Sequence, residues 1–298
     1  MKTSLTFLAA AIFVSSLAGT LMAQTIDVRV EITNNAPTGG VAITPAWVGF
    51  HAGTFDSYNG GLASQPGLES IAEDGSTALL SSQFLDFDAT AGGYTYVGPG
   101  PSNALVRTGD SRDVYRVDGT LVDDDGTPPL LPGESISQDF TLRIDGSNRY
   151  FSYVSMVLPT NDFYIANGNP LAHDLASFYD GEGSISFDIG LAGTINDAGT
   201  EATDYLTSAA NGLLGLGGGQ GGPDTPAGSL GLPNMNVSGD PFAGFGIDTP
   251  DAFNFNDAGL YPNGIATVRL TVVPEPSSSF LALFGLGVTL AIRNKRKK

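Results

Sequence analysis

Short runs of β-forming residues, separated by turn residues, recur along this chain and limit its fold more than any other feature. In Ile26–Ile32 apolar and charged side chains alternate strictly, as they do in a strand with one buried face. Gly, Pro, Asn or Asp bounds each run, and no helical segments alternate with the runs, which argues against a parallel sheet. We therefore predict an all-β fold, an antiparallel β-sandwich. The predicted strands are Ile26–Thr33, Ala46–His51, Gly93–Val97, Ser135–Ile144, Tyr150–Leu158, Ser184–Ile189 and Ile265–Val272.

Three other segments complete the predicted domain, which covers residues 24–272. Pro66–Glu73 is the helix that the pattern predicts, with one or two turns. Asp118–Gly133 is acidic and Pro-rich, so we expect a long loop there. Residues 206–260 contain 13 glycines in 55 positions, a composition typical of flexible loops. We interpret them as a Gly-rich insertion before the last strand.

The first 23 residues have the composition of a secretory signal peptide. Lys2 supplies the positive start, an apolar run covers Leu5–Val14, and small residues lead to a cleavage position after Ala23. The alternative is a buried N-terminal helix. Export would place the protein in the cell envelope or the extracellular space. Because the chain contains no Cys, the exported fold would depend on its core or on metal rather than on disulfides.

The C-terminal segment, residues 273–298, contains a Pro-Glu-Pro motif, an apolar run and a basic end, in that order. Pro274, Glu275 and Pro276 form the motif, and Phe280–Ile292 is the apolar run. As a helix this run spans about 20 Å, which is short for a hydrocarbon core of about 30 Å. The basic end would stay on the cytoplasmic side. We therefore predict an outside domain followed by a short membrane stop.

This order of features resembles the PEP-CTERM sorting signal of Gram-negative bacteria. The resemblance implies transient recognition by an exosortase, a membrane peptidase that is expected to remove the tail. Before that step, the short apolar helix would anchor the protein in the inner membrane. The alternative is a plain C-terminal anchor that is never processed.

The exported part of the chain is strongly acidic. The predicted leader and tail hold six of the 13 basic residues but only one of the 31 acids, Glu275. Residues 24–274 therefore retain 30 acids and seven arginines, a net charge of −23. Such a field repels phosphate backbones, so we expect no nucleic-acid partner. It attracts divalent cations, although solubility alone explains most of these acids.

Three blocks of the middle region resemble the spondin N-terminal domain of exported bacterial proteins. The blocks are Ala46–Phe55 with Leu68–Gly75, Ser155–Ile165, and Asn196–Glu201. The resemblance implies a C2-like antiparallel β-sandwich with a calcium site near the loops at one end. One departure is Asn196, where the family has an aromatic residue. The disulfide cysteines of the animal members are also missing.

The resemblance carries over one carboxylate from each block as a metal ligand: Glu73, Asp162 and Asp197. Calcium takes six to eight oxygen ligands, which loops that converge at one end of a sandwich can supply. The alternative is that each acid caps a local turn. A possible EF-hand at Asp123–Glu134 is rejected, because Pro128 stands where that loop requires Gly.

Two classes of function remain open. We expect a non-catalytic adhesion or matrix module whose calcium is structural and whose partner is extracellular polysaccharide or a surface protein. The alternative is a secreted hydrolase acting on extracellular polysaccharide through paired carboxylates. His51 is expected to be a half-buried strand residue and His173 a loop residue, and no Gly-x-Ser-x-Gly nucleophile elbow is present.

Overall fold

The computed structural model describes residues 24–53, 55–61, 64–85, 115–122, 129–180, 183–201, 235–242 and 251–274. The predicted signal peptide, the predicted strand Gly93–Val97, Glu275, Pro276 and the apolar run Phe280–Ile292 lie outside these residues.

The first of two antiparallel sheets has four strands in the order β5-β1-β12-β9. β1 lies between two strands that are far away in sequence, since Val28 pairs with Phe140 on one side and Val272 on the other. The strands of this sheet are β1 (Thr25–Asn34), β5 (Ser135–Arg143), β9 (Ser184–Ile189) and β12 (Ala266–Val272).

The second sheet has eight antiparallel strands, six of them in the order β11-β10-β7-β6-β3-β4. β2 and β8 also pair with β6, which makes β6 the central strand of this sheet. The strands are β2 (Ala42–Ile43), β3 (Ala46–His51), β4 (Val117–Leu121), β6 (Tyr150–Leu158), β7 (Phe163–Ala166), β8 (His173–Asp174), β10 (Asn196–Asp197) and β11 (Met235–Asn236).

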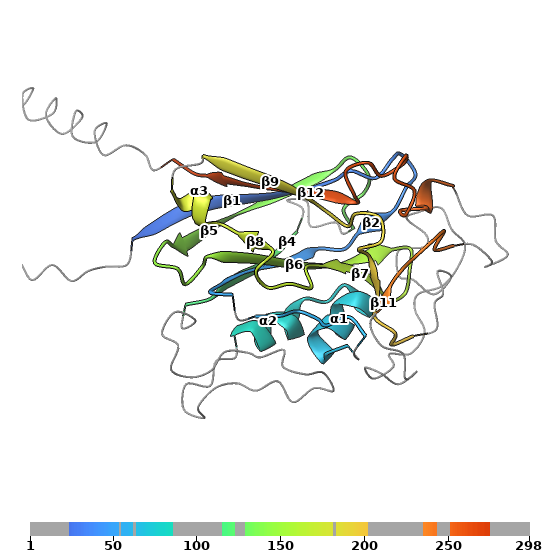
Figure 1. Ribbon diagram of the computed structural model, residues 1–298, viewed down its shortest axis with the longest axis horizontal. Helices are drawn as coiled ribbons and strands as arrows, with labels where there is room; N and C mark the ends of the chain where they lie inside the picture. Colours follow the sequence, from blue (N-terminus) through green and yellow to red (C-terminus); the bar gives the residue numbers. More distant parts are fainter. Residues whose placement is uncertain are drawn as a thin grey trace, which may run out of the picture.

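The two sheets face each other across one hydrophobic core (Figure 1). Val28, Val30 and Ile32 of β1 are fully buried in it, as the alternating pattern predicted. Phe50 and Phe151 approach from the second sheet, with ring centroids 5.3 Å apart. The all-β prediction of antiparallel sheets is confirmed, whereas the C2-like topology stays a prediction.

Two helices cover the other face of the second sheet (Figure 1): α1 (Pro66–Asp74) and α2 (Ala78–Leu85). They enclose a second hydrophobic cluster around Trp47, whose ring meets Phe84 edge-on at 5.1 Å. α1 confirms the predicted helix. It ends at Gly75, which has φ +66° and donates its N–H to Ile71, because this left-handed position suits a residue without Cβ.

Short helical segments also lie between two strands and inside the insertion. α3 (Ala176–Tyr179) lies between β8 and β9 in the chain, and a 3₁₀ turn covers Asp251–Phe253.

The six predicted strands that lie in the described residues are all observed, with ends shifted by at most one residue. Two loop predictions were partly wrong. Residues 118–121 belong to β4, because pairing with β3 and a bond from Trp47 Nε1 to Asp118 (2.9 Å) outweigh the local turn composition. The insertion contributes β11 and three core phenylalanines, since apolar burial stabilises parts of a Gly-rich segment: Phe242, Phe253 and Phe255.

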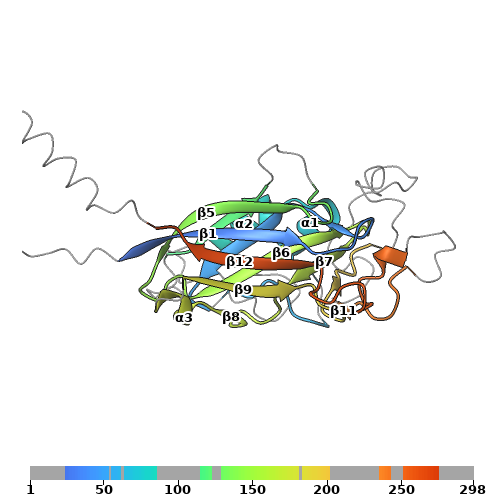
Figure 2. The ribbon, with the colours of Figure 1, turned by 90° about the horizontal axis from the view of Figure 1, so that it is seen from above.

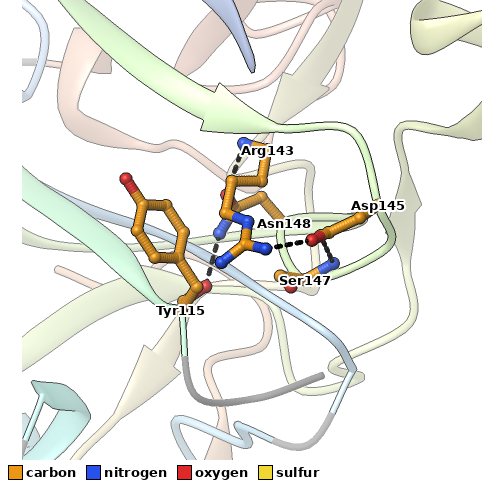
Figure 3. A network of polar contacts seen from close by, with 5 residues as sticks. All are labelled: Tyr115, Arg143, Asp145, Ser147 and Asn148. Atoms are coloured by element: carbon orange, nitrogen blue, oxygen red, sulfur yellow. Dashed lines mark hydrogen bonds and ion pairs between the residues drawn. The ribbon is translucent and has the colours of Figure 1, made fainter. Parts of the chain in front are cut away.

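A polar network fastens the connection between β5 and β6 to the residues before β4 (Figure 3). Buried Asn148 donates to the carbonyls of Tyr115 (2.9 Å) and Phe50 (3.3 Å) and accepts from the Arg143 N–H (2.8 Å). The Arg143 guanidinium lies over the Tyr115 ring and pairs with Asp145 at 2.6 Å. Asn148 therefore holds together the end of the molecule where β1 begins.

Candidate functional site

Asp162 lies in the tight turn between β6 and β7, directly before Phe163. The Thr160 hydroxyl organises this turn, since it donates to the Val157 carbonyl and accepts from the Phe163 N–H (3.2 Å). The turn carries Asp162 to the interior, where it is fully buried. An acid in such a position needs a partner for its charge, because burial penalises the ionised form.

Asp197 is brought beside this turn by the short strand β10. It pairs with Phe163, and the Ala198 N–H donates to the Asp162 carbonyl at 3.0 Å. The Asp197 Oδ1 accepts from the Gly199 N–H at 2.7 Å, and Gly199 has a left-handed φ of +67°. Two of the three carried-over acids therefore meet, although 35 positions separate them in the sequence.

Burial and the neighbouring Asp197 both disfavour the ionised form of the Asp162 carboxyl group. Burial, and next the Asp197 charge, raise the pKa of Asp162 to about 8. Its Oδ2 accepts from the Glu201 N–H at 3.2 Å, which favours the ionised form slightly. Its Oδ1 is buried and has no hydrogen-bond partner among the described residues. Such a pair is stabilised either by one shared proton or by a cation.

Asn161 and Glu201 extend this acid pair and were not predicted as site residues. The Asn161 side chain donates to Glu201 Oε2 at 2.9 Å, which fixes the segment that follows Asp197. Glu201 lies inside the third block of the family resemblance, so the sequence held a signal for it as a site residue. Its contact with Asn161 could not be predicted from the sequence, because 40 positions separate the two residues.

Tyrosines lie near the acid pair and near a further, half-buried acid, Asp56. Burial raises the pKa of Asp56 to about 6. Burial also raises the pKa of Tyr164 well above its ordinary value, and Tyr58, Asp197, Asp162 and Asp56 add to that rise. The Tyr58 and Tyr164 rings meet edge-on at 5.4 Å. This end of the second sheet is therefore rich in groups that favour a bound proton or cation.

Glu73, the third predicted ligand, lies in the last turn of α1, which packs against β6 and β7. Within the described parts of the chain, no three His, Cys, Asp or Glu side chains gather closely enough to hold a metal ion. The structure therefore brings Asp162 and Asp197 together without adding Glu73 as a third acid. The calcium site stays a prediction.

His51 is fully buried in β3 rather than half-buried, because α2 and Phe55 close over the outer face of the sheet. Its Nδ1 accepts from the Gly53 N–H (2.9 Å), so Nε2 carries the proton and donates to Ser152 Oγ (2.9 Å). A base for a serine nucleophile would need the opposite tautomer. Burial lowers the His51 pKa to about 3, which keeps the ring neutral.

His173 belongs to β8 rather than to a loop, because it pairs with Phe151 of β6. Its ring stacks on Phe187, with centroids 3.9 Å apart. Burial lowers its pKa to about 4. Both histidines therefore serve as neutral packing groups in this fold.

Comparison with known proteins identifies the end of the chain. A family model of the PEP-CTERM protein-sorting motif matches residues 272–297. The tail is a PEP-CTERM sorting motif. A search of curated proteins found no match for the chain. The motif indicates an exported protein that an exosortase sorts by way of a membrane-anchored signal, so the predictions of export and of this transient partner are confirmed at that level.

Of the Pro-Glu-Pro motif, the structure describes Pro274, which is exposed two positions after the last residue of β12. Among the described residues, no helix is both long enough and apolar enough to cross a membrane. The predicted apolar helix at Phe280–Ile292 lies outside those residues.

Proposed function

We propose that this protein is a non-catalytic adhesion or binding module of the cell envelope or extracellular matrix. In this proposal the domain is of the spondin N-terminal type, a C2-like sandwich, and binds one structural calcium ion. The observation that carries the proposal is the pair of fully buried Asp162 and half-buried Asp197, in which one Asp162 oxygen has no hydrogen-bond partner among the described residues.

The donor set fits calcium. Carboxylate oxygens are hard ligands, which calcium prefers, and neither a thiolate nor a histidine accompanies the pair. Asp162 and Asp197 would hold the ion, and further oxygens from the Asn161–Asp162 turn or from water would complete its shell. The ion would replace the shared proton and hold the β6–β7 turn against β10. Loops ordered in this way suit contact with polysaccharide or a surface protein.

The acid pair is less suited to hydrolysis of a polysaccharide. Glycosidases place two carboxyl groups on either side of the scissile bond, about 5–10 Å apart, where the substrate can reach both. Asp162 has no exposed surface, so a sugar ring cannot approach it. This burial supports a structural role for the pair.

Calorimetric titration of the purified exported protein tests the calcium site. We expect one calcium ion per chain, and much weaker binding of magnesium, which keeps its waters and demands octahedral geometry. Asp162→Asn should abolish the binding. The control is Asp257→Asn, which alters an exposed acid in the same local sequence as Asp197, Asn-Asp-Ala-Gly. Equal binding by both variants, or no heat with the unmodified protein, would refute the site.

Intact-mass analysis tests the sorting proposal. Protein recovered from the envelope of a host with an active exosortase should lack Phe280–Lys298. Replacing Pro274, Glu275 and Pro276 by alanine should leave an unprocessed membrane form, because the apolar run remains. Retention of the basic tail in the unmodified protein would contradict processing and favour the plain anchor.

A further inference from the structure

The two ends of the folded domain lie on neighbouring strands at the same end of the first sheet. β1 begins at Thr25, and β12 ends at Val272, which pairs with Val28. The next residue, Val273, still donates its N–H to the Asp27 carbonyl at 2.8 Å. Pro274 of the sorting motif follows at once, so no free linker separates the fold from the motif.

The short distance along the chain limits how far this end can be from a membrane. Six residue steps lead from Pro274 to Phe280, where the apolar run begins. Even fully extended, six residues span only about 20 Å. If the apolar run is in the bilayer, the end of β12 therefore lies within about 20 Å of the hydrocarbon boundary.

The acid pair lies at the opposite end of the molecule. The start of β12 is near Gly190, whose carbonyl accepts from the Ile265 N–H at 3.1 Å. From there the chain leads to β10 and Asp197. In Figures 1 and 2, β1 begins and β12 ends on the left, whereas β7 and β11 lie toward the right. The sheet thus separates the tail from the candidate site by the length of β12.

We propose that, in the membrane-held precursor, the end of the sheet formed by Thr25 and Val272 faces the lipid bilayer and the Asp162–Asp197 end faces outward. This proposal rests on the membrane stop of the proposed function. The short tether keeps one end near the lipid. The net charge of −23 on residues 24–274 opposes a flat orientation, in which more acids would approach anionic headgroups.

This orientation exposes the candidate binding end before the exosortase acts. A partner in the matrix could engage the exposed loops around the acid pair while the tail is still attached. The enzyme, by contrast, must work beside the β1–β12 end, where Asn148 and its partners hold the connection between β5 and β6 in place.

Fluorescence energy transfer to labelled lipid headgroups tests the orientation. The chain contains no Cys, so a single introduced thiol gives a unique label. Thr141→Cys and Ser135→Cys form a matched pair on β5. Both positions are exposed on one face of the sheet, and each hydroxyl makes a single hydrogen bond to a β1 side chain (2.6 Å and 2.7 Å).

Each variant also carries alanines at Pro274, Glu275 and Pro276, so that the tail is retained, and is reconstituted into phosphatidylglycerol-containing vesicles. Since six residues of strand separate the two labels by about 20 Å, transfer from position 141 should be about twofold or more greater than from position 135. Equal transfer, or greater transfer from position 135, overturns the orientation. A precursor that does not float with the vesicles contradicts the membrane stop as well.

Discussion

The same four residues, Asn-Asp-Ala-Gly, occur twice in this protein with different results. At residues 196–199 and at residues 256–259 the Asp Oδ1 accepts a hydrogen bond from the Gly N–H, at 2.7 Å in both. Asp197 lies beside a second, fully buried acid, whereas Asp257 is exposed. The comparison teaches that the four residues encode the local Asp–Gly hydrogen bond, whereas the backbone conformation at the Gly and the acid pair depend on the surrounding structure.

The largest expected difference concerns how stability depends on pH, because only the copy with Asp197 lies beside the buried Asp162. In calcium-free buffer, folded Asp162 titrates near pH 8 beside Asp197, whereas an unfolded Asp titrates near pH 4. A raised folded pKa means that the folded state holds the proton more tightly. The proton on Asp162 therefore contributes to the free energy of unfolding. This contribution is fully present below about pH 4 and is lost as the pH rises through about 8, by at most about 1.4 kcal/mol per pH unit.

Urea unfolding between about pH 5 and pH 8 measures this slope. Asp162→Asn should flatten the profile, because it removes the titrating group, and Asp257→Asn should leave the profile unchanged. If Asp257→Asn flattens the profile as much as Asp162→Asn does, Asp162 is not the source of the pH dependence.

The second difference concerns calcium. A ligand that binds only the folded state at a hundredfold excess over its Kd stabilises that state by about 2.7 kcal/mol. For a domain of this size, this corresponds to a rise of about 5–10 °C in Tm. Asp197→Asn should remove most of the rise and Asp257→Asn none of it, as measured by thermal melting with calcium and with a chelator. A rise reduced equally in both variants would indicate nonspecific binding to surface acids.

The third difference concerns packing. Ala198 is fully buried in the cluster around Trp47, whereas Ala258 is exposed. Ala198→Leu should therefore destabilise the protein by about 1–3 kcal/mol through overpacking. Ala258→Leu should change stability by less than about 0.5 kcal/mol. Chemical denaturation of both variants checks this, and similar losses would show that the two alanines have similar surroundings.

The smallest difference concerns the glycines. Gly199 has φ +67°, a region that disfavours residues with a Cβ, whereas Gly259 does not have a positive φ. Gly199→Ala should cost about 1–2 kcal/mol. Gly259→Ala should have a smaller effect, since its added Cβ meets only the exposed Asp257 side chain. Denaturant unfolding of the two variants under identical conditions measures both changes in stability. A larger loss of stability from Gly259→Ala than from Gly199→Ala would contradict this prediction.

Much of the fold could be predicted from the sequence, because strand patterns are local. The alternation in Ile26–Ile32 identified the buried face of β1, and α1 was found from its own residues. β4 was missed, because Val117–Leu121 becomes a strand through pairing with β3. The second helix, α2, was missed as well, since Ala78–Leu85 is apolar around most of its surface and shows little helical periodicity.

The candidate site was only partly predictable. Asp162 and Asp197 were named from a family resemblance, and the structure brings them together, whereas Glu73 does not complete a group of three acids in the described chain. Asn161 and Glu201 were missed, because their contact joins the β6–β7 turn to the segment after β10. A contact between distant segments leaves no local signal in either of them.

The sequence by itself determined the strands with one buried face and the sorting tail, because alternation and a linear motif both act over neighbouring residues. Only the tertiary structure decided which Asn-Asp-Ala-Gly copy would lie beside the buried Asp162. The reason is physical: the pKa of a carboxyl group depends on the solvent it loses and on the charge beside it. For Asp162 the β6–β7 turn removes the solvent, and β10 places the charge of Asp197 beside it.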